Sequence, residues 1–157
     1  MKNLFLLFSL ILISCKSEVN QYQTIKKNVQ LKTGKWIEND DYPNQKYVSI
    51  GRYKMGEKVG VWKVYLNGKI YQKDRFKDSI THTKFYYPNG RILKKGTSKT
   101  IKDSKSIFWY YDGKWKFYNE YGKLEYIKIY YKDSKKTDSI NVKKKDSIKL
   151  NPLPKSS

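Results

Sequence analysis

Short runs of aromatic and β-branched residues alternate with turn-forming residues along most of the chain. The clearest stretch is Gly51–Lys95. Within it, Val61–Leu66 and Lys69–Phe76 have the composition of strands, and the Asn67-Gly68 pair between them favours a two-residue type I′ turn. A second, more degenerate copy follows in the same stretch. The pattern predicts β-hairpins that succeed one another along the chain.

A recurring tripeptide supports an internal repeat. Lys-Asp-Ser begins at Lys77, Lys102, Lys132 and Lys145, at intervals that indicate one insertion and a shortened last copy. In the insertion, two strand-like segments flank Asp112-Gly113, which predicts one further hairpin. Because Asn67-Gly68 needs positive φ, we expect Gly68→Val to weaken folding more than Gly34→Val.

The polar and apolar positions do not separate cleanly onto two faces of the predicted strands. In Leu124–Tyr131, for example, both alternating sets contain tyrosine. The pattern therefore predicts an all-β fold, an elongated antiparallel β-hairpin meander that forms a single-layer repeat sheet. The predicted organisation is a signal peptide at 1–14, a lipidated tether at 15–33, the repeat sheet at 34–145 and a flexible basic tail at 146–157.

The first residues predict export. A lysine precedes the apolar run Leu4–Ile13, which is too short to span a bilayer and is typical of a signal peptide. The following Leu12-Ile13-Ser14-Cys15 resembles the lipobox of bacterial lipoproteins. The resemblance implies cleavage before Cys15, acyl chains on Cys15 and a firm membrane anchor. Because Lys16, not an acidic residue, follows the cysteine, the outer membrane is the expected location in the cell envelope. The alternative is a free Cys15 thiol in an ordinary signal peptide.

A second resemblance covers the repeats. Gly51–Lys69 resembles the bacterial MORN-repeat variant, with its Tyr-Lys-x-Gly-Lys turn, Gly-x-Trp-x-x-Tyr strand and Asn-Gly-Lys turn, and Tyr86–Gly90 and Gly113–Tyr118 look like further copies. The resemblance extends over 34–131. It implies an elongated antiparallel sheet that contacts proteins or lipids, and some relatives are catalogued as antitoxins.

Composition changes this picture chiefly through charge. The chain of 157 residues has a net charge of +20, from 34 basic and 14 acidic residues. An anionic partner such as a membrane surface or an envelope polymer is one explanation, and a solvated lysine surface is the other. Only three of the basic residues are arginines, Arg52, Arg75 and Arg91. This argues against nucleic acid, since arginine makes the bidentate contacts to phosphates and bases.

Few residues are candidates for catalysis or metal binding. His82 is the only histidine and Cys15 the only cysteine, so an intrachain disulfide and a His/Cys metal cluster are excluded. We expect His82 at the surface and the Asp40-Asp41 pair in a solvated turn. The glycines Gly51, Gly56 and Gly60 lack the ending of a phosphate-binding loop and are interpreted as turn residues.

The tryptophans admit two interpretations. The side chains of Trp36, Trp62, Trp109 and Trp115 could stack on sugars or bases. Three of the four follow a predicted turn by two to three residues, and this repeated position favours packing between hairpins. No catalytic, cofactor-binding or metal-binding residue is predicted. The expected function is a non-catalytic, membrane-anchored interaction module that binds a protein or an anionic envelope polymer. The alternatives are an envelope enzyme with carboxylates assembled from distant strands, or an antitoxin-like inhibitor of a partner protein.

Overall fold

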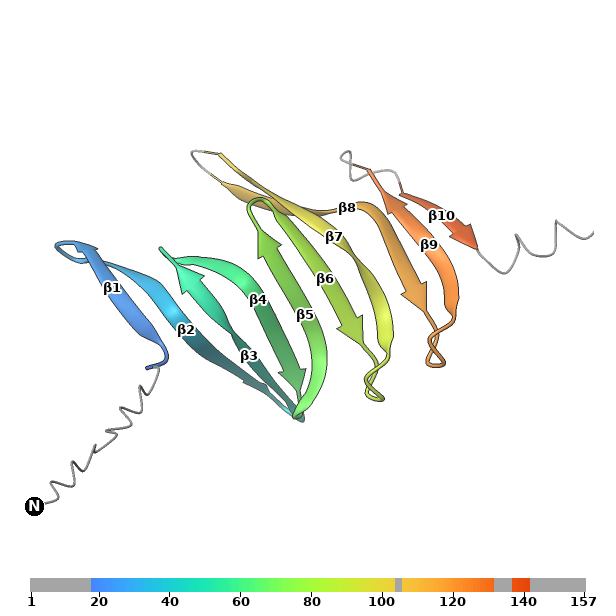
Figure 1. Ribbon diagram of the computed structural model, residues 1–157, viewed down its shortest axis with the longest axis horizontal. Coiled ribbons are helices and arrows are strands. Elements are labelled where there is room, and N and C mark those ends of the chain that lie inside the picture. The colour runs from blue at the N-terminus through green and yellow to red at the C-terminus, as the bar shows by residue number, and fades with distance from the viewer. Residues whose placement is uncertain (1–17, 104–105, 132–136, 142–157) are drawn as a thin grey trace, which may run out of the picture.

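The computed structural model describes residues 18–103, 106–131 and 137–141, and this part of the chain is a single open sheet (Figure 1). The strands are β1 (Gln21–Lys26), β2 (Val29–Tyr42), β3 (Gln45–Lys54), β4 (Glu57–Leu66), β5 (Lys69–Lys77), β6 (Ile80–Tyr86), β7 (Ile92–Lys102), β8 (Ile107–Tyr118), β9 (Leu124–Tyr130) and β10 (Thr137–Asn141). Their order in the sheet equals their order in the sequence, and every neighbouring pair is antiparallel. The predicted all-β meander is confirmed.

The turn chemistry follows the sequence. Asn67 and Gly68 have φ values of 48° and 79°, the two positive angles that a type I′ turn requires. Met55 and Gly56, with 52° and 79°, form the turn between β3 and β4 in the same way. The expected hairpin at Asn67-Gly68 and the expected turn at Gly56 are confirmed, whereas Gly51, also expected in a turn, lies within β3.

The sheet begins earlier than predicted. The segment assigned to a tether, 15–33, contains β1 and the first residues of β2. The ring of Tyr22 packs edge-on against Trp36 at 5.1 Å, and the Asn20 side chain exchanges two hydrogen bonds with the backbone of Ile37. An edge strand of this kind is exposed and polar, and its composition therefore resembles that of a linker.

The predicted hairpin at Asp112-Gly113 is wrong, because β8 runs through these residues without a turn. Gly113 has a φ of 66°, and the register between β7 and β8 shifts at this point. The glycine therefore forms a bulge, two residues before Trp115. Gly60 occupies the same place before Trp62, with a φ of 67° inside β4 and not in the expected turn.

Two glycines that lack positive φ explain where two of the tryptophan side chains pack. The indole of Trp62 lies across Gly51 of the neighbouring strand, and that of Trp115 lies across Gly96, so closely that any Cβ there would overlap the ring. Each indole N–H donates to the carbonyl of the residue after the glycine, at 3.1 Å to Arg52 and 2.8 Å for the second tryptophan.

Few side chains are buried on the packed face of the sheet. Among the described residues, only three hydrophobic side chains are buried: Trp36, Trp62 and Trp115. The predicted packing role is confirmed for these three. Trp109 differs, because 68% of its surface is exposed. The single layer thus has an aromatic face, defined by the three buried tryptophans, and an opposite face that carries other chemistry.

Candidate functional site

The face opposite the tryptophans carries a row of lysines. Register pairs Lys63 with Lys73, Lys73 with Lys84, Lys84 with Lys95, and Lys95 with Lys116. Directly paired residues share a face, so these five side chains form a continuous line across β4 to β8, which we call the lysine row. With neighbouring strands roughly 4.8 Å apart, the row is about 19 Å long.

The lysine row is not neutralised within the described part of the chain. The four ion pairs there join Lys32 and Lys58 to Glu38, Lys99 to Asp112 and Lys102 to Glu57. None of them includes a member of the row. Like charges placed directly opposite each other destabilise a sheet, so the row opposes folding and an approaching anion would relieve it.

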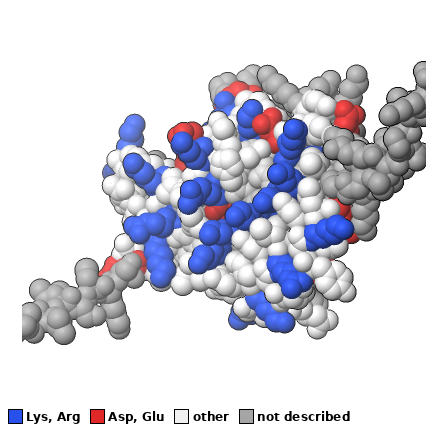
Figure 2. Space-filling model, turned by 45° about the vertical axis from the view of Figure 1, so that its right-hand side comes forward, with Lys and Arg blue, Asp and Glu red and all other residues white. Residues whose placement is uncertain are grey.

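A shallow hollow of 240 Å³ lies along the row. It is lined by residues of β6, β7 and β8: His82, Thr83, Lys84, Lys95, Gly96, Thr97, Lys114 and Lys116. Figure 2 shows one side of the molecule, on which Lys and Arg side chains far outnumber Asp and Glu. The hollow can therefore receive an anionic group among several ammonium groups.

The aromatic face has a different composition at its centre. Asp74 of β5 lies opposite Trp62 on one side and Thr83 on the other. Asp74 and Thr83 are 8% and 7% exposed, and the Thr83 hydroxyl donates a 2.7 Å hydrogen bond to the carboxylate. Gln72 donates to the other carboxylate oxygen, also at 2.7 Å. Burial raises the pKa of Asp74, and the two hydrogen bonds oppose this change.

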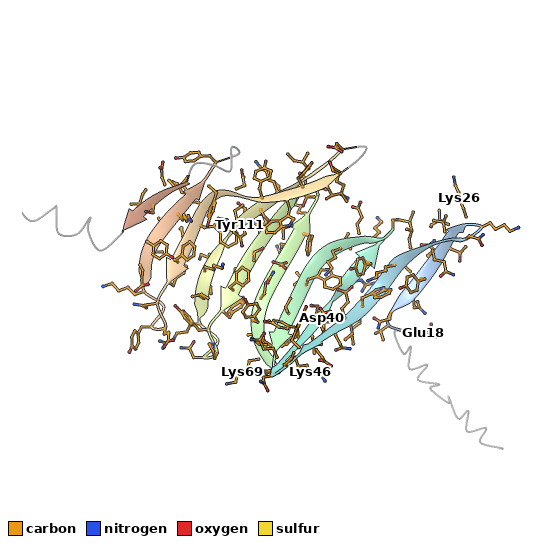
Figure 3. All side chains as sticks on the ribbon, turned by 180° about the vertical axis from the view of Figure 1, so that it is seen from behind. Glu18, Lys26, Asp40, Lys46, Lys69 and Tyr111 are labelled. Atoms are coloured by element: carbon orange, nitrogen blue, oxygen red, sulfur yellow. The ribbon has the colours of Figure 1, made fainter. Side chains whose placement is uncertain are left out.

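Next to Asp74 the aromatic face is hollowed into a groove of 440 Å³. Its lining comes from β5 to β8: Gln72, Asp74, Phe76, Thr81, Thr83, Phe85, Ser98, Thr100, Ile107, Trp109 and Tyr111. Tyr111, labelled in Figure 3, contributes from β8. The groove exists because the repeat has Thr83 here, and not a third large indole beside Trp62 and Trp115.

The groove continues toward the turn between β3 and β4. A second hollow of 710 Å³ shares Phe76, Thr81, Thr100 and Ile107 with it and extends to the Met55-Gly56 turn and Leu31. An ion pair between Lys102 and Glu57 connects the tip of the β7–β8 hairpin to the start of β4, past the shorter β5–β6 hairpin. The two hollows together form one trough, which we call the central trough.

A cluster of charged side chains stabilises the neighbouring part of the sheet. The Glu38 carboxylate accepts hydrogen bonds from Lys32 at 2.8 Å, Lys58 at 3.0 Å and the Tyr53 hydroxyl at 2.9 Å. Burial alone would raise the pKa of Glu38, but these three donors outweigh it and lower the pKa from 4.5 to about 2. The cluster is structural, because its donors and acceptor are matched to one another.

The residues singled out in the sequence lie apart from one another. Cys15 falls outside the described residues. His82 is exposed, as predicted, and borders the lysine row. Asp40 and Asp41 are exposed but belong to β2, so their expected position in a turn is wrong. Within the described ranges, no three His, Cys, Asp or Glu side chains gather as metal ligands would.

Sequence reasoning missed the lysine row and Asp74. The row depends on strand register, which the printed sequence does not reveal. Asp74 could have been found by aligning the copies, since a shift of one repeat places it at the position of Gly51. A carboxylate in place of a glycine is a clear departure from the repeat.

In the described part of the chain, no helix has the length and apolarity needed to cross a membrane. Comparisons of the chain with protein families, with curated proteins and with solved structures found no match. The functional argument therefore rests on the two faces of the sheet.

Proposed function

We propose that the chain is a lipid-anchored protein of the bacterial cell envelope that acts without catalysis, as a module that binds an anionic surface or polymer through the lysine row. The proposal rests on the lysine row, whose five side chains share one face and have no ion-pair partner among the described residues. The lipobox-like Leu12-Ile13-Ser14-Cys15 supports the anchor, and the MORN-like repeats support a binding role for the sheet.

The charge density of the lysine row favours an extended polyanion. One charge per roughly 4.8 Å approaches the single charge per about 3.4 Å of a nucleic-acid strand, and arrays of this density collect counter-ions. A partner of opposite charge releases these ions when it binds, so the binding free energy is favourable and depends on salt. The lysine ammonium is a point charge that imposes no planar geometry, which suits surfaces and polymers of varied structure.

An acyl anchor would strengthen this binding without adding contacts. A chain fixed to a membrane stays within reach of the headgroups, where electrostatic attraction acts over about 8 Å at physiological salt. The β1 end of the sheet lies closest in sequence to Cys15, and the row begins on β4. Weak attraction by each lysine is then sufficient, because the anchor raises the effective concentration.

The test compares two triple variants of equal charge. Lys84→Gln, Lys95→Gln and Lys116→Gln remove the centre of the row, whereas Lys26→Gln, Lys54→Gln and Lys69→Gln remove exposed lysines elsewhere. Binding to phosphatidylglycerol vesicles and to polyphosphate is measured at low salt and at several-fold higher salt. At about 1 kcal/mol per lysine, we expect the row variant to bind about 100-fold more weakly at low salt.

The control variant separates a localised site from overall charge. If the row is the site, the control loses less than about tenfold, because its lysines are spread over the rim of the sheet. Equal losses in both variants would contradict the proposal, as would binding that does not respond to salt. A Cys15→Ala variant tests the anchor, since incorporation of a fatty-acid label should disappear.

A further inference from the structure

The central trough interrupts the regular packing of the aromatic face. Elsewhere a tryptophan covers a glycine of the neighbouring strand, as Trp62 covers Gly51 and Trp115 covers Gly96. At the centre, Asp74 and Thr83 form a hydrogen-bonded pair and leave a hollow above them. A buried carboxylate stabilises this thin sheet less than a packed indole would, so its presence calls for a function.

Hydroxyl groups form the floor of the groove. Thr81 and Thr83 of β6 are buried, Ser98 of β7 is the register partner of Thr81, and Thr100 of β7 also lines the groove. Each hydroxyl can donate one hydrogen bond and accept two, and each oxygen of the Asp74 carboxylate can accept more than the one bond it has. The floor thus offers several donors and acceptors to a ligand with many hydroxyls of its own.

Aromatic rings line the side of the groove. Trp109 and Tyr111 of β8 are in edge contact, with ring centroids 5.7 Å apart, and Phe85 lies on β6. Trp109 remains 68% exposed, in contrast to the three tryptophans that pack on strands. An indole held beside a hollow and not covered by the described residues is available for stacking.

Charge selects among possible ligands. Burial raises the pKa of Asp74, and the positive charge of Lys58 opposes this rise. The ammonium group of Lys94 lies 4.5 Å from the centre of the Phe85 ring, so cations already occupy the neighbourhood of the carboxylate and of the rings. A cationic ligand would meet these ammonium groups, and an anionic ligand would meet the buried carboxylate. A neutral, polyhydroxylated ligand satisfies both.

We propose that the central trough binds a neutral glycan segment, with the apolar face of one sugar stacked on Trp109 and its hydroxyls bonded to Asp74, Thr83 and Ser98. The sugar hydroxyls donate to the Asp74 carboxylate and to the Thr83 oxygen, whose own O–H is already donated to Asp74, and they accept from the Ser98 hydroxyl. The groove of 440 Å³ has the size of a small-molecule site. Its continuation into the hollow of 710 Å³ gives room for further sugar units.

This site is independent of the lysine row, because it lies on the other face and recognises an uncharged ligand. The two proposals therefore fail separately: glycan binding should be insensitive to salt, whereas binding to the row should disappear as salt rises.

The experiment titrates the chain with three neutral trisaccharides, chitotriose, cellotriose and maltotriose, followed by tryptophan fluorescence and saturation-transfer NMR. We expect at least one of them to bind and to perturb the exposed indole. Trp109→Ala should weaken this binding roughly tenfold or more, since stacking on one aromatic side chain is worth about that factor. Asp74→Asn, which keeps the shape and an acceptor for Thr83, should weaken it as well.

Tyr121→Ala is the matched control, because Tyr121 is an aromatic residue 86% exposed in the β8–β9 turn, outside the trough. It should bind as the unchanged chain does. Circular dichroism of each variant confirms that the sheet is retained. Failure of all three trisaccharides to bind, or equal binding by the Trp109→Ala variant, would overturn the proposal. Binding of tetramethylammonium in place of the sugars would overturn it too, since it would identify a cation site.

Discussion

At the scale of single residues, the charged groups of this sheet divide into those with partners and those without. Glu38 has three donors, Lys32, Lys58 and Tyr53, and its side chain is 23% exposed. The five lysines of the lysine row have no carboxylate partner within the described residues. Matched charge stabilises the β2–β4 region, and unmatched charge leaves β4 to β8 open to an anion.

Glu38 predicts a pH dependence of stability. Its pKa is about 2 in the folded chain against 4.5 for the unperturbed group, so the folded state favours the ionised form. The stabilisation is therefore complete above about pH 4.5 and is lost as the pH falls toward 2. Since the lysine partners are partly exposed, we expect Glu38→Gln to lower the free energy of unfolding by about 1–2 kcal/mol at pH 7.

Urea unfolding at neutral and acidic pH measures this effect. The difference between Glu38→Gln and the unchanged chain should shrink as the pH falls, because protonation removes the same interactions. Glu120→Gln, at an exposed turn position, serves as the control and should change little at any pH. A Glu38→Gln loss that stays constant down to pH 2 would show that the cluster stabilises through packing and not through charge.

At the scale of elements, the sequence predicted most of what local chemistry determines. The turns at Asn67-Gly68 and Met55-Gly56, and the strand character around them, follow from residue types that adopt positive φ. Bulges did not follow, because a glycine inside a strand and a glycine in a turn look alike in sequence. Gly113 was assigned to a hairpin for this reason, and it lies within β8.

For the same reason, the register between neighbouring strands cannot be predicted from the sequence. Side chains alternate with a period of two, so one bulge residue moves every later side chain to the other face. The lysine row and the Asp74–Thr83 pair depend on these shifts, and neither could be predicted without the strand pairings. The sequence did predict His82 at the surface and three of the tryptophans in packing.

Backbone angles revise the expectation for two glycine substitutions. Gly34 has a φ of 72° inside β2, close to the 79° of Gly68 in its turn, and a Cβ at either position meets open space. Both substitutions are therefore limited by the backbone alone. We now expect Gly34→Val and Gly68→Val to lower the free energy of unfolding by similar amounts, about 1–3 kcal/mol each.

Chemical denaturation of both variants tests this revision. Asn39→Val, at an exposed strand position with ordinary φ, should be close to neutral and controls for the valine itself. A Gly34→Val chain as stable as the unchanged one would mean that the positive φ at this position of β2 is not needed for the fold.

At the scale of the whole molecule, a net charge of +20 acts on a thin sheet with three buried hydrophobic side chains among the described residues. Repulsion between like charges, including those along the lysine row, destabilises the folded sheet. Added salt screens this repulsion and also weakens the ion pairs. Because repulsive pairs are more numerous than ion pairs, we expect added salt to stabilise the fold.

We therefore expect the melting temperature to rise by about 3 °C when sodium chloride is raised from low to moderate concentration. Differential scanning calorimetry measures the change. The Lys84→Gln/Lys116→Gln chain should melt higher at low salt and gain less from added salt. Lys26→Gln/Lys54→Gln, with the same charge change at the rim, should behave more like the unchanged chain. A melting temperature that falls with salt in the unchanged chain would contradict the balance stated above.

The strand order has a consequence for how the chain acquires its structure. Each strand pairs only with its predecessor and its successor, so every pairing closes a short loop and carries a small entropic penalty. A strand can then join the growing sheet as soon as the next hairpin is available, without waiting for distant residues. A chain threaded through a narrow opening from its N-terminus could in this way fold progressively, one hairpin after another, in the order in which it emerges.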